Sequence, residues 1–150
     1  MANLDVFYSR KSDDWKTPSK LYNAFMKSGY IDPCPYQSVN NGLLYNFYNT
    51  NIFINPPFSK ISDWVNWGIR QSIDYFNKVA FLIPARTDTR YFHELLKYHP
   101  TIYFIKGRLK YNDSEKNAPF PTLLIILNNC HTYETIELNS LIERIENKQL

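Results

Sequence analysis

One tetrapeptide, Asn55-Pro56-Pro57-Phe58, combines residue types that together could activate an amino group attached to an aromatic ring. The side-chain amide oxygen of Asn55 and the backbone carbonyl of Pro56 can each accept a hydrogen bond from such an amine, which makes its nitrogen more electron-rich. Two successive prolines have fixed φ angles and no N–H, so they hold that carbonyl rigidly and place no competing donor nearby. Phe58 can stack on a flipped-out base. The alternative interpretation is a Pro-Pro turn that ends a strand, with Phe58 in the core.

Unusual residues also follow two other predicted strands. The tetrapeptide comes directly after the apolar run 51–54, Asp32-Pro33-Cys34 ends the short strand 30–32, and residues 84–88 follow the buried strand 78–83. Because the carboxyl ends of parallel strands meet at one edge of a sheet, these segments predict a single site there. The Asp32 carboxylate could pair with an ammonium group of a ligand, and an Asp-Pro turn is the alternative reason for its presence.

Helical periodicity alternates with continuous apolar runs along the chain. Thr17 is expected to cap a first helix that has Pro18 as its first residue and ends at Ser28-Gly29. The other expected helices are 59–77, 89–98 and 136–145. The expected strands are 30–32, 51–54, 78–83, 101–105 and 122–127, with one more near 43–47. This alternation predicts an α/β fold in which helices cover both faces of a mostly parallel sheet, and the length predicts one domain over 1–150.

The composition is that of an ordinary globular protein and excludes several classes. With 17 Lys and Arg against 14 Asp and Glu, the net charge of +3 allows a nucleic-acid partner without requiring one. No apolar run reaches the roughly 20 residues of a membrane-spanning helix, and the first residues lack the order of a signal peptide, so we expect a cytoplasmic protein with no membrane partner. Cys34 and Cys130 are expected to be reduced, and the histidines lack zinc-ligand spacing, so no metal site is indicated.

An ordered set of short motifs resembles the phage-type DNA N6-adenine methyltransferases, a Dam-like branch of the S-adenosylmethionine-dependent methyltransferases. The resemblance extends over residues 12–127 and rests on Ser12 to Pro18, Asp32-Pro33-Cys34, Asn55 to Ser59, Trp64-Val65, Leu82 to Thr89, Phe92-His93, Gly107-Arg108 and Ala118 to Thr122. It implies a minimal Rossmann-like methyltransferase fold and methylation of adenine N6 in DNA, with S-adenosylmethionine as cofactor. It also implies a phage or prophage gene connected with restriction-modification.

The same resemblance assigns roles to individual residues. The implied catalytic residues are Asn55, Pro56, Pro57 and Phe58. The residues implied to lie against the methionine end of the cofactor are Trp15, Thr17 and Pro18. Those implied to hold its amino-acid moiety are Asp32, Pro33 and Cys34. The chain departs from the wider methyltransferase pattern after Asp32, where prolines replace the Gly-x-Gly loop that lets a backbone approach the cofactor.

Contacts with DNA would have to come from loops, because 150 residues leave little room for a separate target-recognition domain. The cations beyond the predicted strand ends that suit phosphate contacts are Lys60, Arg86, Arg90 and Arg108. Tyr91 or Phe120 could fill the gap that a flipped base leaves in the stack. A homodimer would be one way to supply a further recognition surface.

Two other functions fit the same residues. The tetrapeptide also suits methylation of other planar amines and amides, including adenine in RNA and glutamine in proteins. The fold could instead serve as a non-catalytic binding module, which the absent glycine loop and the small size favour and the intact tetrapeptide argues against. Binding of S-adenosylmethionine distinguishes the enzymes from the binding module.

Overall fold

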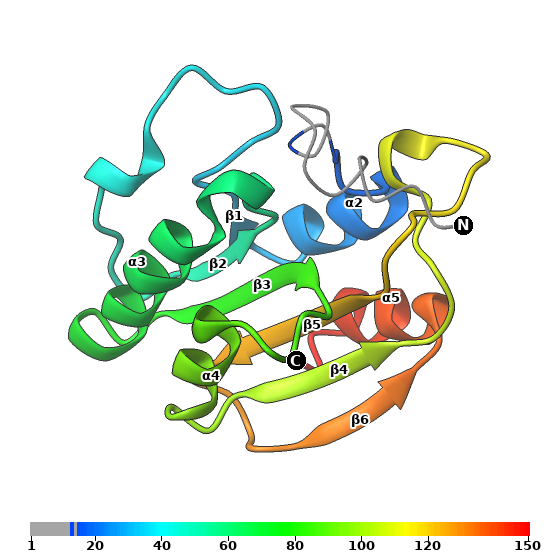
Figure 1. Ribbon diagram of the computed structural model, residues 1–150. Helices are drawn as coiled ribbons and strands as arrows, with labels where there is room; N and C mark the ends of the chain where they lie inside the picture. The colour runs from blue at the N-terminus through cyan, green and yellow to red at the C-terminus, as the bar shows by residue number, and fades with distance from the viewer. Residues whose placement is uncertain (1–12, 14) are drawn as a thin grey trace.

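The computed structural model describes residue 13 and residues 15–150 and contains a six-stranded mixed sheet. Its strands are β1 (Tyr30–Ile31), β2 (Asn51–Ile54), β3 (Lys78–Pro84), β4 (Thr101–Ile105), β5 (Thr122–Leu127) and β6 (Tyr133–Ile136). The order across the sheet is β1-β2-β3-β5-β4-β6, as Figure 1 shows. Strand β5 runs antiparallel to both of its neighbours, and the other neighbouring pairs are parallel. The prediction of an α/β fold with a mostly parallel sheet is therefore confirmed, whereas its Rossmann-like character stays a prediction.

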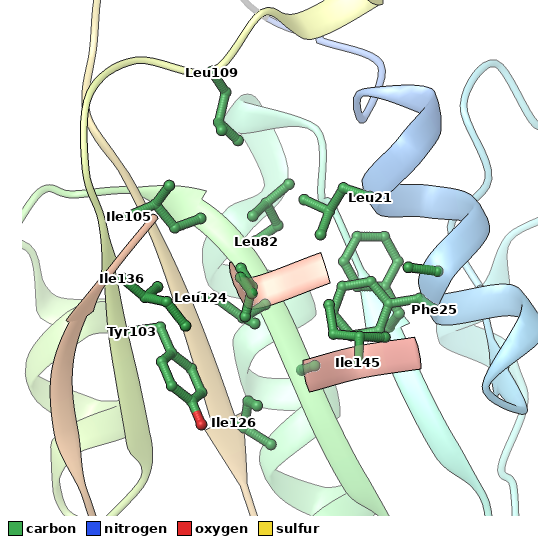
Figure 2. Packing of buried hydrophobic residues seen from close by; sticks show 14 of the residues in the cluster. Leu21, Phe25, Leu82, Tyr103, Ile105, Leu109, Leu124, Ile126, Ile136 and Ile145 are labelled. Carbon is green, nitrogen blue, oxygen red and sulfur yellow. The ribbon is translucent and has the colours of Figure 1, made fainter. Parts of the chain in front are cut away.

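Helices cover both faces of this sheet, as predicted. The helices packed on one face are α2 (Ser19–Lys27) and α5 (Leu138–Glu146), and those on the other face are α3 (Ile61–Asp74) and α4 (Arg90–Leu96). The buried strand β3 supplies both cores, because successive side chains of a strand point to opposite faces. Leu82 packs with Leu21 and Phe25 of α2 on the first face (Figure 2), and Phe81 packs against α3 on the second.

Gly68 allows α3 to lie close to β3. A Cβ atom at this position would lie 2.2 Å from Cζ of Phe81, whose side chain is fully buried. The glycine is therefore required by packing and not by its backbone conformation. In the part of the chain that the structure describes, no helix is long and apolar enough to span a bilayer.

Two parts of the chain differ from the prediction. The segment 43–47 is not a strand, because Asn41 caps a short 3-10 helix, η2 (Gly42–Leu44), by accepting a hydrogen bond from the Leu43 amide. The segment 133–136 is strand β6, which the sequence did not predict. Only Ile136 of its four residues is buried, so the apolar run that marks the other strands is missing at this sheet edge.

The loops after β1, β2 and β4 gather at one edge of the sheet (Figure 1). The chain after β2 forms the 3-10 helix η3 (Phe58–Lys60) before α3, and the loop 106–121 contains another, η4 (Tyr111–Asp113). Both lie beside the amino end of α2, since backbone and side-chain hydrogen bonds join residues 13, 15, 16 and 19 to residues 55, 59, 112 and 113. This edge carries the predicted site.

Candidate active site

A cleft of about 480 Å³ opens beyond the carboxyl ends of β1 and β2. The predicted catalytic and cofactor residues that line it are Trp15, Thr17, Asp32, Cys34, Asn55, Pro56 and Pro57. The predicted residues outside its lining are Pro18, Pro33 and Phe58. Ser12 and Asp14 of the first motif lie outside the described residues. Segments far apart in the sequence thus meet at one hollow on the edge where the strand ends predicted it.

The side-chain amide of Asn55 has a fixed orientation at this cleft. Its Nδ2 donates to the backbone oxygen of Trp15 (2.6 Å) and to Oγ1 of Thr17 (3.0 Å). A backbone carbonyl can only accept, so the atom facing Trp15 must be the NH2 group and not the oxygen. Asn55 Oδ1 is buried and has no hydrogen-bond partner among the described residues. A buried acceptor without a partner costs free energy, and a ligand that uncovers this atom and donates to it would recover that cost.

Thr17 does not cap α2, contrary to the prediction. The N-cap position is taken by Pro18, and no side-chain hydrogen bond caps this end of the helix. The Thr17 hydroxyl oxygen instead accepts a hydrogen bond from Asn55 Nδ2. The oxygen that would cap the helix is therefore already occupied. The expected start of the helix is therefore correct to within one residue, while the predicted role of Thr17 in it is wrong.

Phe58 lies beside the cleft, within an aromatic cluster that consists of Trp15, Phe58, Tyr111 and Phe120. The Phe58 and Trp15 rings stack with centroids 6.0 Å apart at 19°, and Phe120 meets both edge-on at 5.1 Å. One face of Phe58 is therefore covered by Trp15, and stacking of a base on Phe58 stays a prediction. The carbonyl of Pro57 accepts from the Lys60 amide (2.9 Å), which starts η3 immediately after the prolines.

Asp32 combines burial with hydrogen bonding. Its Oδ1 accepts from the Cys34 amide (2.8 Å), and its carboxylate also interacts with the Tyr22 hydroxyl. Burial raises the pKa of Asp32 to about 6, and those two hydrogen bonds limit the rise. The carboxylate is therefore mostly ionised above neutral pH and suits a cationic group. Burial also raises the pKa of the Cys34 thiol to about 12, so Cys34 is not a thiolate nucleophile.

Pro33 lies next to the cleft but does not line it. It is buried, and a Cβ on Gly42 would lie 1.9 Å from its carbonyl oxygen. The loop between β1 and β2 therefore folds back tightly on the segment that follows Asp32. Pro33 thus acts on the site through backbone packing, whereas its neighbours Asp32 and Cys34 line the cleft.

The four predicted DNA-contacting cations follow the carboxyl ends of β2, β3 and β4. Lys60, Arg90 and Arg108 are exposed, and Arg86 is half-buried. They therefore lie on the same edge of the sheet as the cleft. Phe120 is only 4% exposed, so in this conformation it cannot fill the gap left by a flipped base. Tyr91 is half-buried, and burial of its hydroxyl raises its pKa.

Sequence reasoning missed several polar residues around the cleft. Tyr22 interacts with Asp32 and lies near the start of α2. Helical periodicity places Tyr22 on this helix, so this residue could have been found from the sequence. Asn112 and Asp113 carry no such signal. They bind the segment 15–19 across more than 90 residues of sequence, from a loop that looks like ordinary polar surface.

Comparison with protein families gives one result for nearly the whole chain. A family model described as DNA N-6-adenine-methyltransferase (Dam) matches residues 7–147. Among curated proteins, no sequence matches the chain.

Proposed function

Because the chain belongs to the DNA N-6-adenine-methyltransferase (Dam) family, whose members methylate adenine N6 in DNA, we propose that it transfers a methyl group from S-adenosylmethionine to this amine in the cleft at Asn55. The reaction forms a bond between the methyl carbon and N6, breaks the methyl–sulfur bond and releases one N6 proton.

The observation that carries the proposal is the buried Asn55 Oδ1 without a partner. The lone pair of adenine N6 is delocalised into the ring, and hydrogen bonds from both N6 hydrogens counteract this delocalisation. Asn55 Oδ1 supplies one acceptor, held in place because Nδ2 is anchored on Trp15 and Thr17. The Pro56 carbonyl, between two rigid proline rings, is the proposed second acceptor. Acceptors fixed before the reaction favour the transition state without reorganisation, and losing one typically costs a factor of about 10²–10³ in rate.

The residues around the cleft fit the cofactor. S-adenosylmethionine, when bound, supplies an electrophilic methyl group on a sulfonium, and its amino-acid end carries an ammonium. Asp32 is the group we propose for that ammonium, since its half-buried carboxylate lacks a cationic partner among the described ion pairs. Asp32 and Asn55 line the same cleft. Trp15 and Thr17 are proposed to lie against the methionine end.

DNA contacts are proposed for Lys60, Arg86, Arg90 and Arg108, which flank the cleft edge. Such cations would hold the phosphate backbone while the target adenine leaves the stack. Protection of phage DNA from a host restriction enzyme is the biological use that we propose for this activity.

The decisive experiment measures the product of the reaction. The purified protein is incubated with methyl-labelled S-adenosylmethionine and unmethylated DNA, and the digested nucleosides are analysed by mass spectrometry. We expect labelled N6-methyldeoxyadenosine, reduced about 10²–10³-fold by Asn55→Ala. Asn51→Ala is the matched control, because Asn51 lies exposed at the opposite end of β2 and should leave the rate unchanged.

Each negative result points to a different conclusion. No transfer to DNA together with transfer to RNA or protein would change the substrate class. Cofactor binding without any transfer would mean a catalytically inactive protein. Failure to bind S-adenosylmethionine at millimolar concentration, measured by isothermal titration, would overturn the enzymatic proposal.

A further inference from the structure

Hydrogen bonds join the segment 15–19, which lines the cleft, to the loop 106–121, which does not line it. The segment 15–19 carries the two groups that anchor Asn55, and the loop 106–121 holds this segment through Asn112 and Asp113. We propose that Asn112, together with Asp113, is a positioning residue that fixes which face of the Asn55 amide meets the target amine. The proposal rests on the methyl transfer proposed above.

The first link is a reciprocal pair between Asn112 and Lys16. The Lys16 amide donates to Asn112 Oδ1 (2.7 Å), and the Asn112 amide donates to the Lys16 carbonyl (2.9 Å). Two hydrogen bonds in opposite directions fix both the distance and the orientation of the two backbones. Lys16 is bonded directly to Trp15 and Thr17, so this pair restrains both residues that hold Asn55.

The second link holds the other end of the segment. The Ser19 amide donates to Asp113 Oδ1 (2.8 Å), and the Ser19 hydroxyl donates to Asp113 Oδ2. Ser19 is the first residue of α2, so the carboxylate also meets the positive end of that helix. These hydrogen bonds and the nearby Lys16 ammonium lower the pKa of Asp113, which stays ionised over the neutral range.

The side chains of the same loop support the same segment. The Trp15 ring meets Tyr111 edge-on at 5.8 Å and Phe120 edge-on at 5.1 Å. Tyr111 precedes Asn112 directly, so one turn of chain holds the indole ring and the adjacent backbone together. The loop thus fixes Trp15 at its side chain and, through Lys16, at its carbonyl.

This restraint bears on the chemistry because an amide has two unlike ends. With the Trp15 carbonyl and the Thr17 hydroxyl in place, Nδ2 is occupied and Oδ1 is left for the amine. If the segment moved outward, rotation of the amide by half a turn would no longer be opposed. An NH2 group facing the N6 amine would then be a donor facing a donor. Even a displacement of about 1 Å can lower a rate by 10²-fold.

Asn112 permits a clean pair of substitutions because its φ is +60°. Glycine adopts this left-handed conformation without strain and aspartate tolerates it, so neither variant should disturb the backbone. Asn112→Gly removes the acceptor for the Lys16 amide, and Asn112→Asp keeps it. We expect kcat for methyl transfer to fall at least tenfold in Asn112→Gly and to stay within about threefold of wild type in Asn112→Asp. Asn49→Gly is the matched control, since Asn49 is exposed, has a φ of +49° and lies in the loop before β2.

Two further measurements separate positioning from general loosening. Hydrogen exchange of the Lys16 amide should accelerate in Asn112→Gly and not in Asn112→Asp. In an Asn55→Ala background, Asn112→Gly should have no further effect on kcat, because its effect passes through the Asn55 amide.

The proposal is overturned if Asn112→Gly transfers methyl groups at the wild-type rate, or if the two substitutions multiply in the double variant. Equal losses in the Gly and Asp variants would also contradict it. An inactive wild-type protein would instead refute the proposed function. The link itself would still be tested by the Lys16 amide, whose fast exchange in the wild type would show that the contact does not form.

Discussion

Replacing Asn55 by Asp exchanges one NH2 group for an oxygen and tests the orientation of the amide directly. In the wild type, Nδ2 lies 2.6 Å from the Trp15 carbonyl oxygen and 3.0 Å from Thr17 Oγ1. An ionised Asp at this position would place one oxygen against another, and both atoms can only accept. The Thr17 hydroxyl can turn its proton toward the new carboxylate, so this second contact survives the change.

The magnitude follows from the one contact that is lost. A buried acceptor left without its donor costs about 1–3 kcal/mol, so Asn55→Asp should lower the free energy of unfolding by that amount at pH 8. Protonation restores a donor, because the O–H of a neutral Asp can bond to the Trp15 carbonyl. The pKa of the introduced carboxyl is therefore raised above its ordinary value in the folded protein. With a raised folded-state pKa, the deficit is fully present above that pKa and shrinks as the pH falls below it.

Urea unfolding of wild type, Asn55→Asp and Asn51→Asp between pH 5 and pH 8 measures this effect. Asn51→Asp adds the same charge at the exposed start of the same strand and should show no such pH dependence. With S-adenosylmethionine kept saturating at each pH, methyl transfer by Asn55→Asp should be about 10²–10³-fold below wild type at pH 8, and this deficit should shrink toward pH 5. An Asn55→Asp protein as stable as wild type at pH 8, or a deficit that is equal at all pH values, would refute the assigned orientation of the amide.

Three further predictions concern other parts of the molecule. Because burial raises the pKa of Asp32 to about 6, titration calorimetry should find S-adenosylmethionine bound roughly tenfold more weakly at pH 5 than at pH 8. Asp32→Asn should bind weakly at both pH values, and equal wild-type affinities at both would contradict the proposed ion pair. Gly68→Ala should lower the free energy of unfolding by about 1–3 kcal/mol, since the new methyl group meets the buried ring of Phe81; an unchanged urea midpoint would show that the helix can shift without cost. Arg108→Gln should weaken binding to DNA of any sequence and reduce the slope of log K against the logarithm of the salt concentration by about 1. An unchanged slope would show that Arg108 does not contact the DNA phosphates.

The sequence predicts the sheet well where burial is continuous. The runs 51–54, 101–105 and 122–127 coincide with β2, β4 and β5, because a strand covered on both faces consists mostly of apolar residues. Strand β6 lacks this signal, since it lies at an edge and buries only Ile136. Its pairing with β4 depends on a partner that only the folded chain provides.

The site was predictable to the extent that strand ends define it. Asp32 and Asn55 follow two strands that turned out to be neighbours, so their convergence required only the rule that parallel strands end at one edge. Thr17 shows where that reasoning fails. Its local preference for a helix cap was outweighed by the Asn55 amide, 38 residues away, and no local pattern contains that information. The Asn112 contact, 96 residues from Lys16, is of the same kind.

The register of β1 and β2 explains how one cleft can serve both ends of the proposed cofactor. Ile31 pairs with Ile52 at the end of β1, so continuing this register would bring Asp32 opposite Phe53, two residues before Asn55. With strands about 4.8 Å apart and a rise of about 3.3 Å per residue, an undistorted continuation of both strands would separate the two Cα atoms by about 8 Å. In S-adenosylmethionine the ammonium and the methyl-bearing sulfur are joined by a short aliphatic chain. A register shift of one residue would change this separation by about 2–3 Å and turn the Asn55 side chain to the other face. The pairing of β1 with β2 therefore sets the separation across which the ammonium at Asp32 and the amine at Asn55 would be held.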